Sequence, residues 1–218
     1  GVRTCALPIF LQLELEQALR DAPADSPAQQ TYSSLLEEIQ RLKAILDKLL
    51  LLSLADSGRM SLQRTPVDLG RILADILEDG AALAPQLHFH LTLEPKVTVS
   101  ADAVLLEQAL QNLVGNAIKY NRGNGEVRVT LAARNGVACV QVANTGPGIA
   151  PEDQGRVFER FFRGDRARTR DATTGVGLGL SLSREILRAH GGDLALTESK
   201  PDHTVFAATL PIEPPAAT

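Results

Sequence analysis

A polar stripe lies along one face of a helix that the sequence predicts near the middle of the chain. It consists of Asn112, Asn116, Lys119 and Tyr120, which are neighbours on a helix surface because of their spacing. Amide oxygens can complete the ligand shell of a Mg²⁺ ion that phosphates already hold, and lysine supplies a compact positive charge for those phosphates. An aromatic ring beside them could cover a base. The stripe indicates a nucleotide site, and a solvated helix face is the alternative.

The helix that would position this stripe is predicted to span Asp102 to Tyr120. Its apolar residues recur at helical spacing, so that another face of the helix would pack against a hydrophobic core. These apolar residues are Leu105, Leu106, Ala109, Leu110, Leu113 and Ala117.

Three further blocks follow this helix, and each would have a separate role at one site. Residues 144–148 are Asn-Thr-Gly-Pro-Gly, residues 158–162 are Phe-Glu-Arg-Phe-Phe, and residues 175–180 are Gly-Val-Gly-Leu-Gly-Leu. Alternate glycines let a backbone approach a phosphate closely, and a helix start offers free N–H groups and a positive dipole end. One glycine-rich loop is weak evidence, whereas this ordered set is strong evidence for a nucleotide site.

In this order the blocks resemble the N, G1, F and G2 boxes of the ATP-binding domain of two-component sensor histidine kinases. The resemblance covers residues 58–211 and extends more loosely back to Leu11. It implies an α+β fold, the two-layer α/β sandwich with a mixed sheet that is shared with gyrase and Hsp90-type ATPases (the Bergerat ATP-binding fold). It also implies that an α-helical hairpin of a dimeric four-helix bundle precedes this domain.

The resemblance implies ATP and Mg²⁺ as cofactors. Asn116 would be the Mg²⁺ ligand, and Asn112 and Lys119 would be the catalytic residues near the phosphates. Tyr120 would form a wall beside the adenine. The other implied ATP-binding residues are Asn144, Gly146, Gly148, Phe158, Gly175, Gly177, Leu178, Gly179 and Leu180.

Three positions differ from the residues found in the family or in its ATP-hydrolysing relatives. In hydrolysing relatives a Glu that activates water stands where this chain has Asn112, and an amide cannot accept that proton, so phosphoryl transfer is favoured over hydrolysis. Asn144 replaces an Asp that commonly accepts a hydrogen bond from the adenine amino group. An amide accepts without charge assistance, so we expect weaker or less selective adenine binding. His203 replaces a usual glycine, which leaves the local turn open.

The segment between the aromatic and glycine-rich blocks, residues 163–174, resembles the mobile ATP lid of the family. It contains Arg163, Arg166, Arg168 and Arg170, and we expect one of them to reach the γ-phosphate. The alternative interpretation is an ordinary solvated loop. The two interpretations are compatible, because a lid must be weakly packed in order to open.

The residues before position 58 predict a helical hairpin at 11–57, whereas residues 1–10 have no periodic pattern and are predicted to be non-native. A first helix is predicted from Leu11 to Arg20, and Ser26 with Pro27 should begin the second. The second helix carries a heptad seam that predicts a homodimer, with packing on its own domain as the alternative. The seam consists of Leu35, Ile39, Leu42, Leu46 and Leu49.

The predicted catalytic domain spans residues 58–213, and residues 214–218 form a tail. Asp68 should cap a helix, and strands are predicted at 87–93, 126–132, 137–143, 193–197 and 204–210. Asn135-Gly136 is a strong hairpin signal. His88 and His90 are expected at the surface rather than in a metal site.

Composition limits the function classes. The net charge of −4 offers no basic field for nucleic acid. No apolar run is long enough to cross a bilayer, so we expect this fragment to be soluble. Cys5 and Cys139 are far apart and lack metal-type spacing, which excludes a disulfide framework and favours a reduced compartment.

The phosphoacceptor histidine of the family is missing, because the histidines are at 88, 90, 190 and 203, none of them on the hairpin. We therefore interpret the chain as the ATP-binding catalytic portion of a sensor histidine kinase. It would transfer the γ-phosphate to a histidine outside this chain for relay to a response regulator. The resemblance implies that this is the cytoplasmic portion of an inner-membrane protein. The alternative is a non-catalytic, nucleotide-gated dimerisation module.

Overall fold

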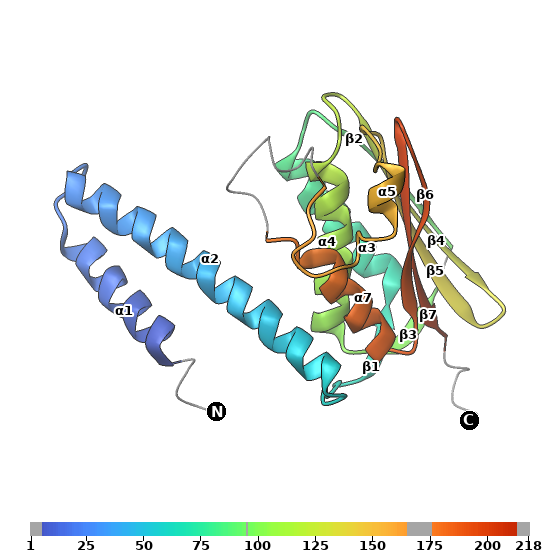
Figure 1. Ribbon diagram of the computed structural model, residues 1–218, viewed down its shortest axis with the longest axis horizontal. Coiled ribbons are helices and arrows are strands. Elements are labelled where there is room, and N and C mark those ends of the chain that lie inside the picture. The colour runs from blue at the N-terminus through green and yellow to red at the C-terminus, as the bar shows by residue number, and fades with distance from the viewer. Residues whose placement is uncertain (1–5, 95, 165–175, 213–218) are drawn as a thin grey trace. The chain divides into compact units, whose positions relative to one another are not determined.

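The computed structural model describes residues 6–94, 96–164 and 176–212, and it divides into two compact units, residues 1–53 and 54–218 (Figure 1). The segment predicted to be non-native lies partly outside the described residues, as does the whole 214–218 tail. In the described part of the chain, no helix has the length and apolar character needed to cross a membrane.

The first unit contains α1, Ala6–Asp21, and most of α2, Pro27–Asp56, whose last turn belongs to the second unit. Ser26 begins α2 as predicted, since its hydroxyl accepts a hydrogen bond of 3.1 Å from the N–H of Gln29. Helix α1 starts at Ala6, before the predicted Leu11. Pro8 is compatible with this earlier start, because a proline in the first turn of a helix removes no intrahelical hydrogen bond.

The second unit is built on a five-stranded sheet of order β2-β4-β5-β7-β6, in which β2 runs parallel to β4 and the other pairs are antiparallel. Two shorter strands, β1 and β3, pair separately. The bounds are β1 Thr65–Asp68, β2 His88–Leu93, β3 Thr98–Ala101, β4 Glu126–Arg134, β5 Val137–Asn144, β6 Asp193–Lys200 and β7 His203–Pro211. The sequence did not predict β1 and β3, because four-residue strands are too short to show alternation.

Two tight turns fix the register of this sheet. Asn135 and Gly136 join β4 to β5 with φ of 52° and 76°, so the predicted hairpin is confirmed. Between β6 and β7, Asp202 takes the left-handed position with φ of 63°, and His203 then pairs with Lys200. The turn therefore forms without a glycine at position 203.

Helices α3, α4 and α7 cover one face of the sheet (Figure 1). They span Leu69–Leu83, Ala103–Lys119 and Gly179–Ala189, and a short α5 spans Pro151–Gln154. Asp68 caps α3 as predicted, accepting from the N–H of Gly70 at 2.9 Å. Leu110 of α4 and Ile186 of α7 are fully buried. The predicted two-layer α/β sandwich with a mixed sheet is therefore confirmed.

Candidate nucleotide site

Helix α4 is oriented by its apolar face and by a cap at its start. The Asp102 carboxylate accepts a hydrogen bond of 3.2 Å from the N–H of Leu105. Because Leu110 and Leu113 are buried, the polar stripe falls on the remaining surface. Asn116 is half-buried, as is the neighbouring Asn112.

Lys119 and Tyr120 lie at the C-terminal end of this stripe, and both are exposed. The Lys119 ammonium lies 5.1 Å from the centroid of the Tyr120 ring, a cation–π contact that places charge and ring side by side. The structure therefore places three residues of the stripe on α4 and the fourth, Tyr120, at its C-cap, with the amides more buried than the lysine and the tyrosine.

Helix α7 begins beside the middle of α4. The buried Ser183 hydroxyl donates to the carbonyl oxygen of Ala109 at 3.2 Å and so ties the two helices together. At the start of α7, a β-carbon on Gly179 would lie 3.4 Å from Oδ1 of Asn112. Leu178 is buried and gives α7 no side-chain cap, so the positive end of the helix faces Asn112 without a competing side-chain acceptor from that position.

The side-chain amide of Asn112 has an unused donor. Its Nδ2 is buried and has no hydrogen-bond partner among the described residues. Buried donors are nearly always satisfied in folded proteins, so an unpaired donor on a residue that lies beside a helix N-terminus is evidence for a bound acceptor. A phosphate oxygen fits this position, because it accepts hydrogen bonds and carries the negative charge that a helix N-terminus favours.

The glycine-rich block packs directly on the aromatic block. Gly177 has φ of 77°, and a β-carbon there would lie 2.6 Å from the carbonyl oxygen of Phe162. The Gly177 carbonyl oxygen accepts a hydrogen bond of 2.9 Å from the N–H of Phe161. Phe158 packs edge-on against Phe206 of the core, with ring centroids 6.2 Å apart. The aromatic block therefore supports the turn that leads into α7.

The Asn144 block meets the end of α4. Asn144 is 8% exposed, and its Nδ2 donates to the carbonyl oxygen of Thr145 at 2.8 Å, which leaves its Oδ1 as the acceptor. A β-carbon on Gly146 would collide with the carbonyl oxygen of Tyr120, so only glycine permits this approach. Gly148, with φ of 72°, similarly lies against the backbone of Lys200.

The sequence patterns missed a polar junction that fixes this approach. The Thr145 hydroxyl donates to Oδ1 of Asn121 at 2.6 Å and accepts from the N–H of Glu126 at 2.8 Å. Asn121 Nδ2 donates to the carbonyl oxygens of Ala117 and Glu126. The position of Asn121 directly after the polar stripe was the available signal.

Part of the predicted lid and the first glycine of the glycine-rich block lie outside the described residues. These residues include Gly175, Arg166, Arg168 and Arg170. Of the lid arginines only Arg163 is described. His88 and His90 are exposed on β2. Among the residues that the structure describes, no group of three His, Cys, Asp or Glu side chains could hold a metal ion.

Comparison with known proteins gives the same assignment. Residues 101–214 match the family model "Histidine kinase-, DNA gyrase B-, and HSP90-like ATPase". The probable sensor histidine kinase TcrY of Mycobacterium tuberculosis is 36% identical over 214 residues, which are 97% of this chain and 44% of TcrY. The chain thus spans less than half the length of this relative.

Solved structures share the fold. The mycobacterial sensor histidine kinase MprB is 31% identical with a TM-score of 0.62, over 69% of this chain and 99% of that one. The crystal structure of full-length ShkA in complex with AMPPNP is 25% identical with a TM-score of 0.80, over 98% of this chain and 46% of that one. The chain therefore belongs to the family of histidine kinase-, DNA gyrase B- and HSP90-like ATPases, and it carries the ATP-binding catalytic portion of a sensor histidine kinase.

Proposed function

We propose that this chain binds ATP between α4 and the start of α7 and transfers the γ-phosphate to a histidine on another protein segment. The observation that carries the proposal is the side-chain amide of Asn112, whose Oδ1 lies beside Gly179 and whose buried Nδ2 has no hydrogen-bond partner among the described residues. A phosphate there would accept from Asn112 and from the first N–H groups of α7, which Leu178 does not cap. The crystal structure of the related ShkA contains AMPPNP, an analogue of ATP, and this supports the same ligand class.

Mg²⁺ is part of this proposal, with Asn116 as its protein ligand. Mg²⁺ retains several waters and is usually bound through one or two protein oxygens together with substrate phosphates. The half-buried amide of Asn116, one turn from Asn112, fits that donor set. When bound, the metal would neutralise charge on the phosphates, while Lys119 would add a positive charge near them.

Transfer rather than hydrolysis is favoured because Asn112 cannot act as a base toward water. In phosphoryl transfer, most of the protein's contribution is positioning and charge neutralisation, which amides, lysine and helix N–H groups can supply. The catalytic roles of Asn112 and Lys119 and the adenine contacts of Tyr120 and Asn144 are part of the proposal, and they are carried over from the resemblance of these positions to the motifs of the family.

The partners follow from the relatives. A response regulator is the proposed final acceptor, since a histidine kinase of the same fold, ThkA, was solved in complex with the response regulator TrrA (23% identical, TM-score 0.64, over 96% of this chain and 59% of that one). We also propose that the full-length protein is membrane-anchored with this portion in the cytoplasm.

A homodimer through the helical hairpin is the remaining part of the proposal. Leu42, Leu46 and Leu50 of α2 are each more than half exposed. A contiguous exposed apolar stripe marks an interaction surface, and a second copy would cover it in a four-helix bundle.

The deciding experiment is calorimetric titration of AMPPNP, with and without Mg²⁺, into the wild-type chain and Asn116→Ala. We expect saturable binding that requires Mg²⁺ and weakens in the variant. Gln111→Ala is the matched control, because it removes an exposed amide of the same helix outside the polar stripe. Absence of binding to the wild-type chain would refute the ATP site.

A second assay separates the kinase from the nucleotide-gated module. The chain, ATP and Mg²⁺ are incubated with a separate helical hairpin that carries a His-Glu-Leu-Arg-Thr-Pro sequence. Acid-labile phosphorylation of that histidine supports transfer. Tight nucleotide binding without any transfer would instead favour the non-catalytic dimerisation module.

A further inference from the structure

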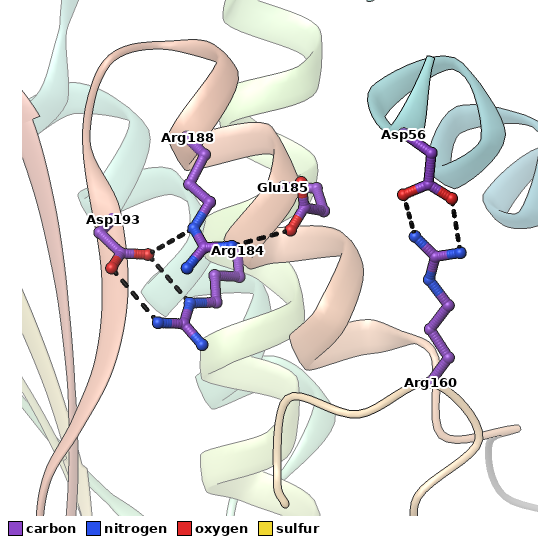
Figure 2. Close-up of polar contacts among 6 residues, drawn as sticks. All are labelled: Asp56, Arg160, Arg184, Glu185, Arg188 and Asp193. Atoms are coloured by element: carbon purple, nitrogen blue, oxygen red, sulfur yellow. Dashed lines mark hydrogen bonds and ion pairs between the residues drawn. The ribbon is translucent and has the colours of Figure 1, made fainter. Parts of the chain in front are cut away.

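Arg160 of the aromatic block and Asp56 at the end of α2 form a two-point ion pair (Figure 2). The two guanidinium nitrogens, Nη1 and Nη2, lie 2.7 Å and 2.5 Å from the two carboxylate oxygens, across 104 residues of sequence. Parallel Arg–carboxylate hydrogen bonds fix both side chains in orientation as well as in distance. Both residues belong to the same compact unit.

The position of Asp56 in its helix is unfavourable without Arg160. It is the last residue of α2, where the negative end of the helix dipole disfavours a carboxylate, and the last turn of α2 contains no basic residue. The helix stops directly afterwards, since Gly58 has φ of 65° and the N–H of Arg59 donates to the carbonyl oxygen of Leu54. The hydrogen bonds from Arg160 lower the pKa of Asp56 below its usual value, so the charged pair persists at neutral pH.

Arg160 is adjacent to the contact between the aromatic block and the glycine-rich turn. Phe161 has φ of 63°, unusual for an aromatic residue, and its N–H donates to the carbonyl oxygen of Gly177. Phe161 is 57% exposed, so side-chain burial contributes little to holding this backbone. The Asp56–Arg160 pair is the described polar contact that holds the residue directly before Phe161.

The turn that Phe161 supports leads straight to the nucleotide site. Gly177 precedes the buried Leu178, and Gly179 then begins α7 opposite Asn112. Displacement of the aromatic block would shift this turn, because Gly177 already lies in contact with the backbone of Phe161 and Phe162.

We propose that the Asp56–Arg160 ion pair is a positioning contact that holds the glycine-rich turn in its nucleotide-binding geometry and makes nucleotide affinity depend on the last turn of α2. Neither residue contacts the reacting atoms. The proposal rests on the proposed ATP site. It assigns to α2 a second role, beyond dimerisation, in which a change at the end of the helix alters the start of α7.

The first test measures backbone protection without nucleotide. Amide hydrogen exchange is compared for the wild-type chain, Asp56→Asn and Arg160→Gln. Each variant should exchange faster at the Phe161 amide, with little change in the protection of α4. Glu198→Gln is the matched control, because it removes an exposed carboxylate whose ion pair with Lys200 is 2.6 Å long, and it should leave Phe161 unchanged. Unchanged exchange at Phe161 in both variants would overturn the proposal.

The second test is a double-mutant cycle on the affinity for AMPPNP with Mg²⁺. Each single variant should bind at least about threefold more weakly, and the double variant should bind no more weakly than either one, since both break the same contact. Additive effects, or affinities equal to that of the wild-type chain, would contradict the coupling. If the wild-type chain binds no nucleotide, the proposed function fails, whereas the exchange experiment still decides whether Asp56 orders the aromatic block.

Discussion

Nε2 of His190 accepts a hydrogen bond of 2.9 Å from the backbone N–H of Asp102, across 88 residues of sequence. Nδ1 of the same ring lies 2.7 Å from the carbonyl oxygen of Ile186 and must carry the proton, so the ring is neutral. His190 is 1% exposed. It joins the end of α7 to the start of α4, opposite the ends that form the candidate nucleotide site.

The neutral state of His190 predicts a loss of stability in mild acid. Burial lowers its pKa below the usual value of 6.5, so below that pH the unfolded chain binds a proton that the folded chain resists. The free energy of unfolding should therefore fall as the pH drops below 6.5. Urea unfolding at several pH values checks this. The His190→Gln variant should lose this decrease in the free energy of unfolding below pH 6.5. The His88→Gln variant, at an exposed position, should retain it.

Asp193 predicts a second, more acidic dependence. Hydrogen bonds from Arg184 at 3.0 Å and from Arg188 at 3.1 Å lower its pKa to about 2 (Figure 2). Its stabilisation should be complete above pH 3.8, its usual pKa, and should disappear as the pH falls toward 2. Because the pair is partly exposed, we expect Asp193→Asn to cost at most about 1 kcal/mol at pH 7. A cost that did not shrink between pH 4 and pH 2 would contradict this assignment.

Gly177→Ala should destabilise the second unit and weaken nucleotide binding. The left-handed backbone alone costs an alanine about 1–2 kcal/mol. Its β-carbon would also lie 2.6 Å from the carbonyl oxygen of Phe162, so the turn into α7 would have to move. Thermal unfolding gives the first effect, and AMPPNP titration gives the second. An alanine variant with wild-type values in both would refute the packing role of Gly177.

Gly115→Ala should have the opposite effect on stability. Gly115 lies inside α4, is exposed, and has open space where a β-carbon would stand. Replacement of a mid-helix glycine by alanine should raise the free energy of unfolding by about 0.5–1 kcal/mol. Urea unfolding checks the gain, and the affinity for AMPPNP should not change. A loss of stability would mean that α4 is less regular around Gly115 than its hydrogen-bonding pattern indicates.

Local sequence patterns determined much of the fold and the grouping of site residues along α4. The period of Leu106, Leu110 and Leu113 predicted the helix and placed Asn112 and Asn116 on its other face, because a helix relates residues three and four apart. Asn135-Gly136 predicted the β4–β5 hairpin, because its turn requires two residues with positive φ. These features depend on neighbours in the chain, and so they can be read from short windows of sequence.

Only the tertiary structure decided how separate segments meet. The unpaired amide of Asn112 beside Gly179, the Thr145–Asn121 hydrogen bond and the Asp56–Arg160 ion pair all join residues far apart in sequence. The same holds for the pairing of β1 with β3. No local pattern encodes such contacts, because a polar residue has the same local preferences whether its partner is water or a distant side chain. Packing of the helices on the sheet fixes which of these residues come within hydrogen-bonding distance.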